Sequence, residues 1–138
     1  MQRGQFFTGI AVLMVLVACK TGGSHNQSKV ASADSLPFIK FDSLMISIGS
    51  ILSGEKAGID FVYTNTGGQE LEVLEARVSC GCTVPEWKKE KVGPGQKGNI
   101  RVIYDSSGEL GMQNKSIRII SNARNREVDL IISAEVIN

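Results

Sequence analysis

The fold of this 138-residue chain is decided by the stretch Ile59-Asp60-Phe61-Val62-Tyr63-Thr64, which is followed by Asn65-Thr66-Gly67-Gly68. Ile59, Phe61 and Tyr63 alternate in the first part with Asp60, Val62 and Thr64, which is the period of a strand with one buried face. The second part is rich in residues that favour turns. The same rhythm recurs along the chain and predicts seven short strands, over residues 38–41, 45–48, 59–64, 71–80, 100–104, 117–119 and 128–136.

No window of a dozen residues sustains a helical period, so we expect an all-β fold. Seven short strands within residues 36–138 match the size of an immunoglobulin-like β-sandwich, and a five-stranded barrel is the alternative. A slip in the alternation at Leu74-Glu75 predicts a β-bulge. Gly93-Pro94-Gly95 predicts a turn, and the Lys- and Glu-rich stretch 86–91 predicts an edge or a loop.

The N-terminal residues predict a targeting signal. One Arg and no acidic residue precede an apolar run of roughly 13 residues, too short to span a membrane as a helix. The run ends in Leu16-Val17-Ala18-Cys19, which resembles a bacterial lipobox, so we expect residues 1–18 to be a lipoprotein signal peptide and Cys19 to carry lipid. An ordinary secretory signal with a chance cysteine is the alternative.

Residues 20–35 are almost all small or polar, a composition that predicts a flexible tether between Cys19 and the domain at 36–138. A flexible chain of about 16 residues spans roughly 20–24 Å, enough to lift a small domain clear of the lipid headgroups. Lys20 stands where some enterobacterial lipoproteins carry an Asp that retains them in the inner membrane. Its presence favours the outer membrane.

The charge pattern limits the partners. The chain carries 15 Lys and Arg against 14 Asp and Glu, a formal net charge of +1, and the two signs are interspersed. Nucleic acid is excluded as a partner because phosphate binding requires a clustered basic face. Attachment to the membrane through the lipid anchor, with an envelope protein or glycan as the partner, is what we expect.

Several short motifs together resemble the bacterial family called domain of unknown function 1573, over about residues 38–136. They are Asn65-Thr66-Gly67, Ser79-Cys80-Gly81-Cys82-Thr83, Pro94-Gly95, Tyr104-Asp105 and Ser121-Asn122. The resemblance implies a small lipoprotein or secreted protein of the Gram-negative cell envelope with an immunoglobulin-like fold. It implies no activity.

Cys80 and Cys82 are separated by Gly81 alone. In an extended strand their Cα atoms would lie about 6.4–7 Å apart, at or beyond the limit for a disulfide. A bond between them requires the backbone to tighten into a turn, which Gly81 permits.

Three interpretations of this pair stay open. It is a local turn with no chemistry, a thiol–disulfide redox site, or a two-coordinate Cu(I) site. Against a redox site, no helix N-terminus follows that would lower a thiol pKa. Against a metal site, further ligands are scarce, because His25 lies in the predicted tether and Met112 is far along the chain.

The sequence predicts a non-catalytic protein. With its single His in the tether, the domain cannot assemble a Ser-His-Asp site. Glu70, Glu72 and Glu75 fit solvent-facing strand positions better than a paired acid and base. We therefore expect a membrane-anchored interaction module with no firm cofactor, whose binding surface includes Ser79, Thr83 and Trp87. For Trp87, an aromatic position at the edge of the core is the alternative.

Overall fold

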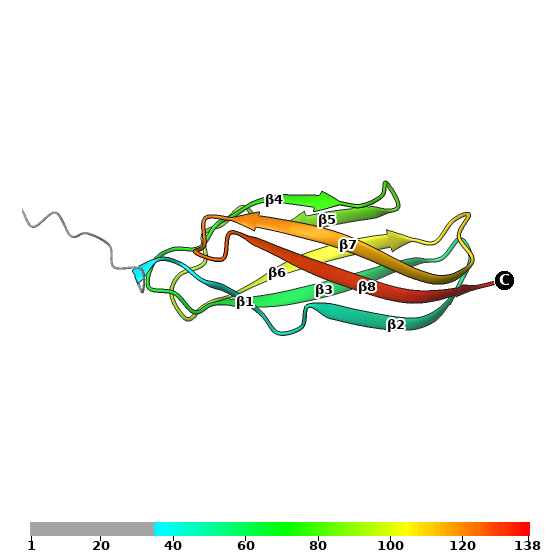
Figure 1. The fold of residues 1–138 in the computed structure, drawn as a ribbon, viewed down its shortest axis with the longest axis horizontal. Coiled ribbons are helices and arrows are strands. Elements are labelled where there is room, and N and C mark those ends of the chain that lie inside the picture. Colours follow the sequence, from blue (N-terminus) through cyan, green and yellow to red (C-terminus); the bar gives the residue numbers. More distant parts are fainter. Residues whose placement is uncertain (1–34) are drawn as a thin grey trace, which may run out of the picture.

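The computed structural model describes residues 35–138 (Figure 1). The predicted signal peptide, Cys19, His25 and all but the last residue of the predicted tether lie outside the described residues. Within residues 35–138, the structure contains no helix that could cross a membrane.

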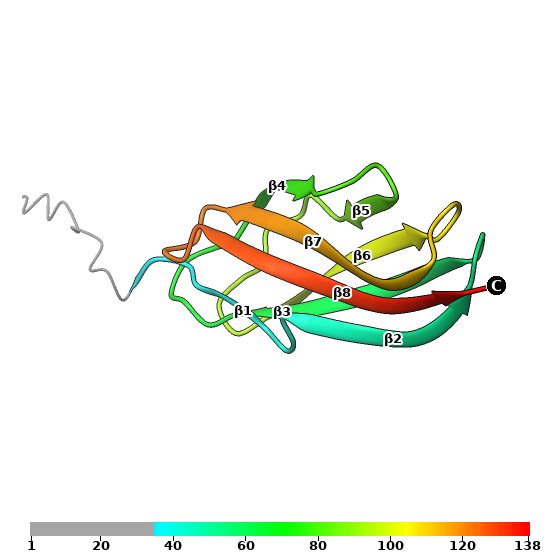
Figure 2. The same ribbon diagram turned by 45° about the vertical axis from the view of Figure 1, so that its right-hand side comes forward.

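Eight strands form two four-stranded sheets packed face to face (Figures 1 and 2). The strands are β1 (Ile39–Phe41), β2 (Met45–Leu52), β3 (Lys56–Asn65), β4 (Val73–Val78), β5 (Thr83–Trp87), β6 (Lys97–Asp105), β7 (Gly111–Ser121) and β8 (Glu127–Ile137). One sheet has the order β1-β3-β6-β5 and the other β2-β8-β7-β4. All neighbouring pairs are antiparallel except β2 and β8. Two separate sheets confirm the sandwich and rule out the five-stranded barrel.

The seven predicted segments fall on β1 to β4 and β6 to β8, and the bulge between Val73 and Glu75 is confirmed. The strand count of seven was one too low. The additional strand, β5, contains Pro85 and Glu86, which interrupt the alternation, and it pairs with β6 alone. An edge position suits a proline, because no neighbour needs its missing N–H.

Alternation places the apolar side chains of both sheets in one shared core. The stretch that decided the fold supplies Ile59, Phe61 and Tyr63, each less than 5% exposed. Their polar neighbours in sequence face outward. The other buried side chains of the long strands include Ile100, Val102, Tyr104, Ile117, Ile119, Leu130 and Ile132.

The predicted turn after β3 is held by one buried amide, that of Asn65. Its side-chain nitrogen donates hydrogen bonds to the carbonyl oxygens of Gln69 and Val92, at 2.7 and 2.8 Å. Its side-chain oxygen accepts from the backbone N–H groups of Phe38 and Gly67, at 3.4 and 3.0 Å. A fully satisfied buried amide fixes three chain segments at this end of the sandwich.

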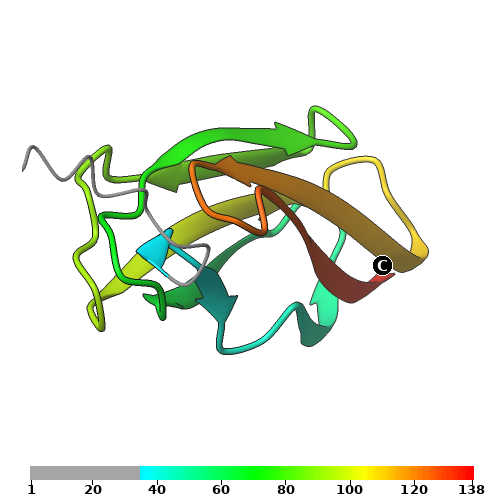
Figure 3. The ribbon, with the colours of Figure 1, turned by 60° about the vertical axis from the view of Figure 1, so that its left-hand side comes forward.

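The two ends of the sandwich differ in what they carry (Figures 1 and 3). The proximal end, where the described chain enters, carries the turns at 66–70, 93–96 and 122–126. The distal end carries the turns at 53–55, 79–82 and 106–110 and the C-terminus. The turn at 79–82 connects β4 to β5, which lie side by side along one flank although they belong to different sheets.

The packing of Tyr63 predicts a cost for one small substitution. A Cβ atom added at Gly98 would lie 2.3 Å from the ring and hydroxyl of Tyr63, a side chain that is 3% exposed, so the packing around it would have to shift. We expect Gly98→Ala to lower the free energy of unfolding by about 1–3 kcal/mol in urea denaturation. Gly58→Ala is the matched control, because its Cβ would meet only the Arg101 guanidinium, at 2.6 Å, and that exposed group can swing away. Equal effects of the two substitutions would contradict this packing.

Candidate functional site

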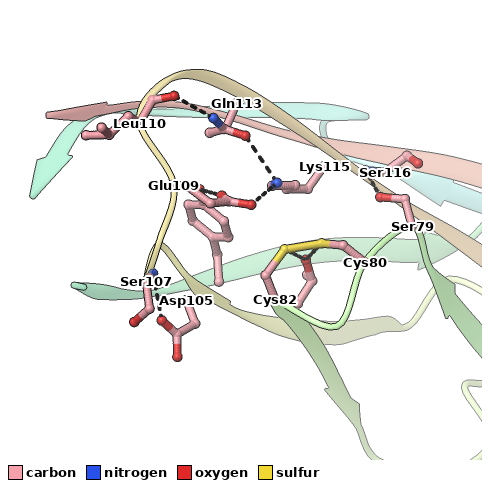
Figure 4. Close-up of polar contacts among 12 residues, drawn as sticks. Ser79, Cys80, Cys82, Asp105, Ser107, Glu109, Leu110, Gln113, Lys115 and Ser116 are labelled. Carbon is pink, nitrogen blue, oxygen red and sulfur yellow. Dashed lines mark hydrogen bonds and ion pairs between the residues drawn. A yellow bond between two sulfur atoms is a disulfide. The ribbon is translucent and has the colours of Figure 1, made fainter. Parts of the chain in front are cut away.

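A disulfide joins Cys80 and Cys82 in the turn between β4 and β5 (Figure 4). Their Cα atoms are 5.4 Å apart, closer than in an extended strand, so the backbone is tightened at Gly81. Both cysteines are half-buried, whereas Gly81 is exposed with no atom within 4 Å of where its Cβ would be. A bridge that closes so short a loop contributes less than about 2 kcal/mol of chain entropy, against about 3 kcal/mol for a 15-residue loop.

Hydrogen bonds tie both ends of this turn to the sheets. Ser79 and Ser116 are linked twice, by the Ser79 N–H to the Ser116 carbonyl at 3.1 Å and by the Ser116 N–H to Ser79 Oγ at 3.2 Å. After the turn, the Asp105 N–H donates to the Cys82 carbonyl at 2.9 Å. The disulfide therefore sits in a turn whose position does not depend on it.

Thr83 lies beneath the disulfide. We expected it on a binding surface, but it is 3% exposed, because as the first residue of β5 it faces the core opposite Tyr104. Its Oγ1 lies 3.4 Å from Cys80 Sγ and 3.8 Å from Cys82 Sγ, both within hydrogen-bond range for sulfur. The expectation of a surface role for Thr83 is therefore wrong.

Trp87 lies at the opposite end of β5 and is also turned inward. Its indole N–H donates to the Val73 carbonyl at 3.2 Å, and its ring packs against the core. The structure thus separates the exposed Ser79, which precedes β5, from Trp87, which is the last residue of that strand. The expected surface of Ser79, Thr83 and Trp87 is not a single surface.

Part of Trp87 lines an open groove of about 690 Å³ on the outer side of the first sheet. Lysine and arginine side chains are prominent around it, but three of these cations have acidic partners. Lys91 pairs with Glu70 at 3.3 Å, and Lys97 and Arg101 pair with Asp42 and Asp60 at 3.4 and 3.1 Å. These pairs are exposed, so each contributes little to stability.

A cluster of three polar side chains closes the core beside the disulfide turn (Figure 4). Lys115 lies opposite the buried Ile132 on β8 and therefore faces inward, with 12% of its side chain exposed. Its ammonium group forms an ion pair with Glu109, which also accepts a hydrogen bond from the Tyr104 hydroxyl. The ammonium nitrogen lies 5.9 Å from the centre of the Tyr104 ring. This cluster was not predicted, although Lys115 is in phase with Ile117 and Ile119.

The cluster shifts the acidity of its members. Burial is the main cause that raises the pKa of Tyr104, and Glu109 adds to the rise. Burial also opposes ionisation of Glu109, but hydrogen bonds from Lys115 and Tyr104 outweigh it and lower the pKa of Glu109. Nearby, hydrogen bonds from Ser107 and Lys56 lower the pKa of Asp105 to about 2. Glu109 and Asp105 are therefore charged, and Tyr104 is neutral, at physiological pH.

Four large exposed apolar side chains lie at the distal ends of β2, β7 and β8 and in the loop before β7, and we call them the distal apolar cluster. They are Leu52 (48%), Leu110 (59%), Met112 (68%) and Ile137 (43%). The register places Leu52 opposite Ile137 and Met112 opposite Glu135 on the neighbouring strand. The side chains therefore gather at the ends of β2, β8 and β7, beside the loop that carries Leu110.

The other predicted residues occupy ordinary positions. Glu70 and Glu75 are exposed and paired with Lys91 and Arg77, and Glu72 is half-buried. Within residues 35–138, no group of three or more His, Cys, Asp or Glu side chains is placed to hold a metal ion. The two sulfur atoms are bonded to each other, so Cu(I) binding would first require their reduction. Cu(I) binding stays a prediction.

Two packed four-stranded sheets, between which the chain passes repeatedly, define an immunoglobulin-like sandwich. The chain belongs to the family described as "Protein of unknown function (DUF1573)", whose model matches residues 39–136. No curated protein sequence matches the chain.

Solved structures support the fold. A Porphyromonas gingivalis W83 protein of unknown function is similar at a TM-score of 0.66 with 16% identity, over 79% of this chain and 51% of that one. A PapD-like domain of human CEP192 has a TM-score of 0.56 and 8% identity, over 95% of this chain and 99% of that domain. The VesB protease of Vibrio cholerae has a TM-score of 0.56 and 14% identity, over 72% of this chain and 32% of that one. The chain spans about half of the Porphyromonas protein, and these likenesses concern the fold alone.

The ion pair in the polar cluster predicts a pH-dependent stability. Glu109→Gln leaves the inward ammonium of Lys115 without its counter-ion, so we expect a loss of about 2–3 kcal/mol at neutral pH. Folding lowers the pKa of Glu109. The ionised carboxylate therefore contributes fully to the free energy of unfolding above the ordinary carboxyl pKa of about 4.3. The contribution is lost as the pH falls through the lowered value, so the wild-type and variant stabilities should converge in acid.

Urea denaturation across pH measures this difference. Asp42→Asn is the control, since it breaks the exposed ion pair with Lys97 and should change stability by less than about 1 kcal/mol at any pH. If Glu109→Gln behaved like Asp42→Asn, the cluster would not hold the distal end together.

Proposed function

We propose that the protein is a non-catalytic interaction module of the bacterial cell envelope, anchored through a lipid on Cys19, in the outer membrane. Its distal end binds a partner protein. The anchoring part of the proposal rests on the lipobox-like Leu16-Val17-Ala18-Cys19. The binding part rests on the described structure.

The observation that carries the binding part is the position of the distal apolar cluster. It lies at the end of the sandwich opposite the point where the described chain enters, at Ser35 (Figure 1). A chain tethered to a membrane through residues before Ser35 would present the other end to whatever lies beyond the membrane surface. Large apolar side chains gathered in one exposed place are typical of protein-binding surfaces.

The chemistry of the cluster favours a protein over a glycan. Its side chains are aliphatic or thioether groups, those of Leu52, Leu110, Met112 and Ile137. Their removal from water is favourable in free energy, and they offer few hydrogen-bonding groups to sugar hydroxyls. The groove beside Trp87 is more polar, but the indole N–H there is already bonded to Val73. A glycan at that groove is the alternative that the experiments below separate.

The charged groups support a non-catalytic role. The two inward-facing charges, on Lys115 and Glu109, neutralise one another, which is a structural arrangement. Exposed charges such as Arg118 and Asp129 pair across neighbouring strands at 2.7 Å. In both cases an ion pair within the protein accounts for the charged side chain, and no role in binding a substrate is needed to explain it.

Anchoring is tested by removing the predicted lipid site. We expect wild-type protein to be labelled with palmitate and to sediment with outer membranes in a density gradient. Cys19→Ala should lose the label and appear in the soluble fraction, because no acyl chain then inserts into the bilayer. Cys82→Ser is the control and should sediment as wild type. Unchanged sedimentation of Cys19→Ala would contradict the anchor.

Binding is tested in living cells with a photo-crosslinking amino acid at Met112. We expect a discrete adduct that is absent when the crosslinker is at Thr66, an exposed residue at the proximal end. Leu110→Asp should abolish the adduct because it places a charge in the apolar surface. Leu74→Asp is the matched control, since Leu74 is 49% exposed but lies near the start of β4, towards the proximal end.

The two crosslinker positions, Met112 and Thr66, also distinguish binding at the distal end from binding elsewhere. An adduct at Thr66 alone, or an adduct at Met112 that survives Leu110→Asp, would contradict binding at the distal end. Protection of Lys88 from chemical labelling by envelope glycans would indicate the groove beside Trp87 instead.

A further inference from the structure

The buried hydroxyl group of Thr83 is an unusual partner for a disulfide. It is buried, and the two sulfur atoms are the hydrogen-bond partners that the described structure gives to its Oγ1 (Figure 4). A sulfur atom in a disulfide is a weak acceptor, so this hydroxyl is poorly satisfied while the bridge is intact. Buried polar groups are usually better paired than this.

Reduction of the bridge would improve that hydrogen bond. A thiolate is a charged acceptor, and hydrogen bonds to charged groups are markedly stronger than those to neutral ones. Cys80 Sγ is the nearer of the two sulfur atoms, at 3.4 Å against 3.8 Å for Cys82 Sγ. Thr83 is therefore placed to stabilise a thiolate on Cys80 more than one on Cys82.

We propose that Cys80 and Cys82 form a redox-active site that exchanges disulfides with a dithiol protein. A thiolate of that protein attacks Cys82 Sγ, a mixed disulfide forms, and the bond to Cys80 Sγ breaks. Cys80 leaves as a thiolate that accepts the hydrogen bond from Thr83. The second thiol of the partner, deprotonated, then attacks its own half of the mixed disulfide and releases Cys82.

The exchange balances in atoms and electrons. The partner dithiol loses two electrons and two protons and becomes a disulfide, and the pair at Cys80 and Cys82 gains both and becomes a dithiol. The reverse reaction returns the bridge and reduces a partner disulfide. No other oxidant or reductant takes part.

The surroundings of the bridge permit this exchange. Gly81 is exposed and has open space around it, so a partner can approach the half-buried sulfur atoms from that side. The hydrogen bonds at Ser79 and at the Cys82 carbonyl hold the turn independently of the bridge. The two thiols should therefore stay close after reduction, which favours reclosure.

Other charges near the pair do not select between the two cysteines. Lys115 on β7 is engaged by Glu109 of the loop at 106–110, and Asp105 on β6 is paired with Lys56 at 3.0 Å. Tyr104 on β6 is neutral and donates to Glu109. This leaves the Thr83 hydroxyl as the group that touches both sulfur atoms. The inference goes beyond the proposed envelope module and holds whether or not Cys19 carries lipid.

The redox equilibrium tests the inference on the full chain, purified in detergent and equilibrated with glutathione buffers. Alkylation followed by trypsin yields a peptide from Val78 to Lys88 that holds both cysteines and no other. At about pH 8.5, where an ordinary thiol is half ionised, we expect a measurable dithiol fraction. Thr83→Val should shift the equilibrium roughly tenfold toward the disulfide. Thr83→Ser keeps the hydroxyl and should stay within about threefold of wild type.

Variants with a single cysteine in the domain give a second measurement, the pKa of each thiol. This measurement keeps Thr83, so it stays informative even if Thr83→Val fails to fold. The rate of alkylation by iodoacetamide against pH reports the thiol pKa. We expect Cys82→Ser, which keeps Cys80, to react at lower pH than Cys80→Ser, which keeps Cys82. Equal profiles, or a bridge that glutathione never reduces, would overturn the proposal.

Discussion

The arrangement of the distal end depends on one charged side chain that faces the core instead of the solvent. Lys115 lies on β7 in phase with Ile117 and Ile119, so its side chain points between the sheets, where an unpaired ammonium is strongly unfavourable. The loop at 106–110 returns Glu109 to it, and Tyr104 completes the contact. This ion pair holds the loop, which carries Leu110, together with hydrogen bonds from Ser106 Oγ to the carbonyl oxygens of Leu52 and Glu55, at 2.9 Å each.

The cluster around Lys115 is connected to the disulfide turn through residues on neighbouring strands. Tyr104 pairs with Thr83 across β6 and β5, and Thr83 touches both sulfur atoms. The fully buried Tyr104 is thus the cross-strand neighbour of the residue that contacts the bridge. The proximal end is built differently, around the neutral amide of Asn65, which holds its turns without a charge. The disulfide and the distal apolar cluster both lie at the end that contains this ion pair.

Strands with one apolar face could be predicted from the sequence, because alternation alone shows them. The apolar alternation disappears where polar residues face inward. β7 begins at Gly111, but the side chains that residues 111–116 direct inward are Gln113 and Lys115. The predicted segment therefore began at Ile117. β5 was missed because Pro85 and Glu86 break the pattern. The need for a tightened turn at Gly81 followed from bond geometry. The burial of Thr83 did not, because it depends on β5 pairing with β6, and the inward position of Trp87 was one of two alternatives that the sequence left open.

The two proposals are physically compatible because the bridge closes so little chain. A disulfide across a long loop would couple its redox state to global stability, whereas Cys80 and Cys82 constrain a turn that Ser79, Ser116 and Asp105 already hold. Reduction then changes the chemistry of the turn and leaves the core of Phe61, Ile100 and Leu130 intact. An interaction module can carry such a bridge at its binding end because the apolar contacts there do not depend on the oxidation state of the two sulfur atoms.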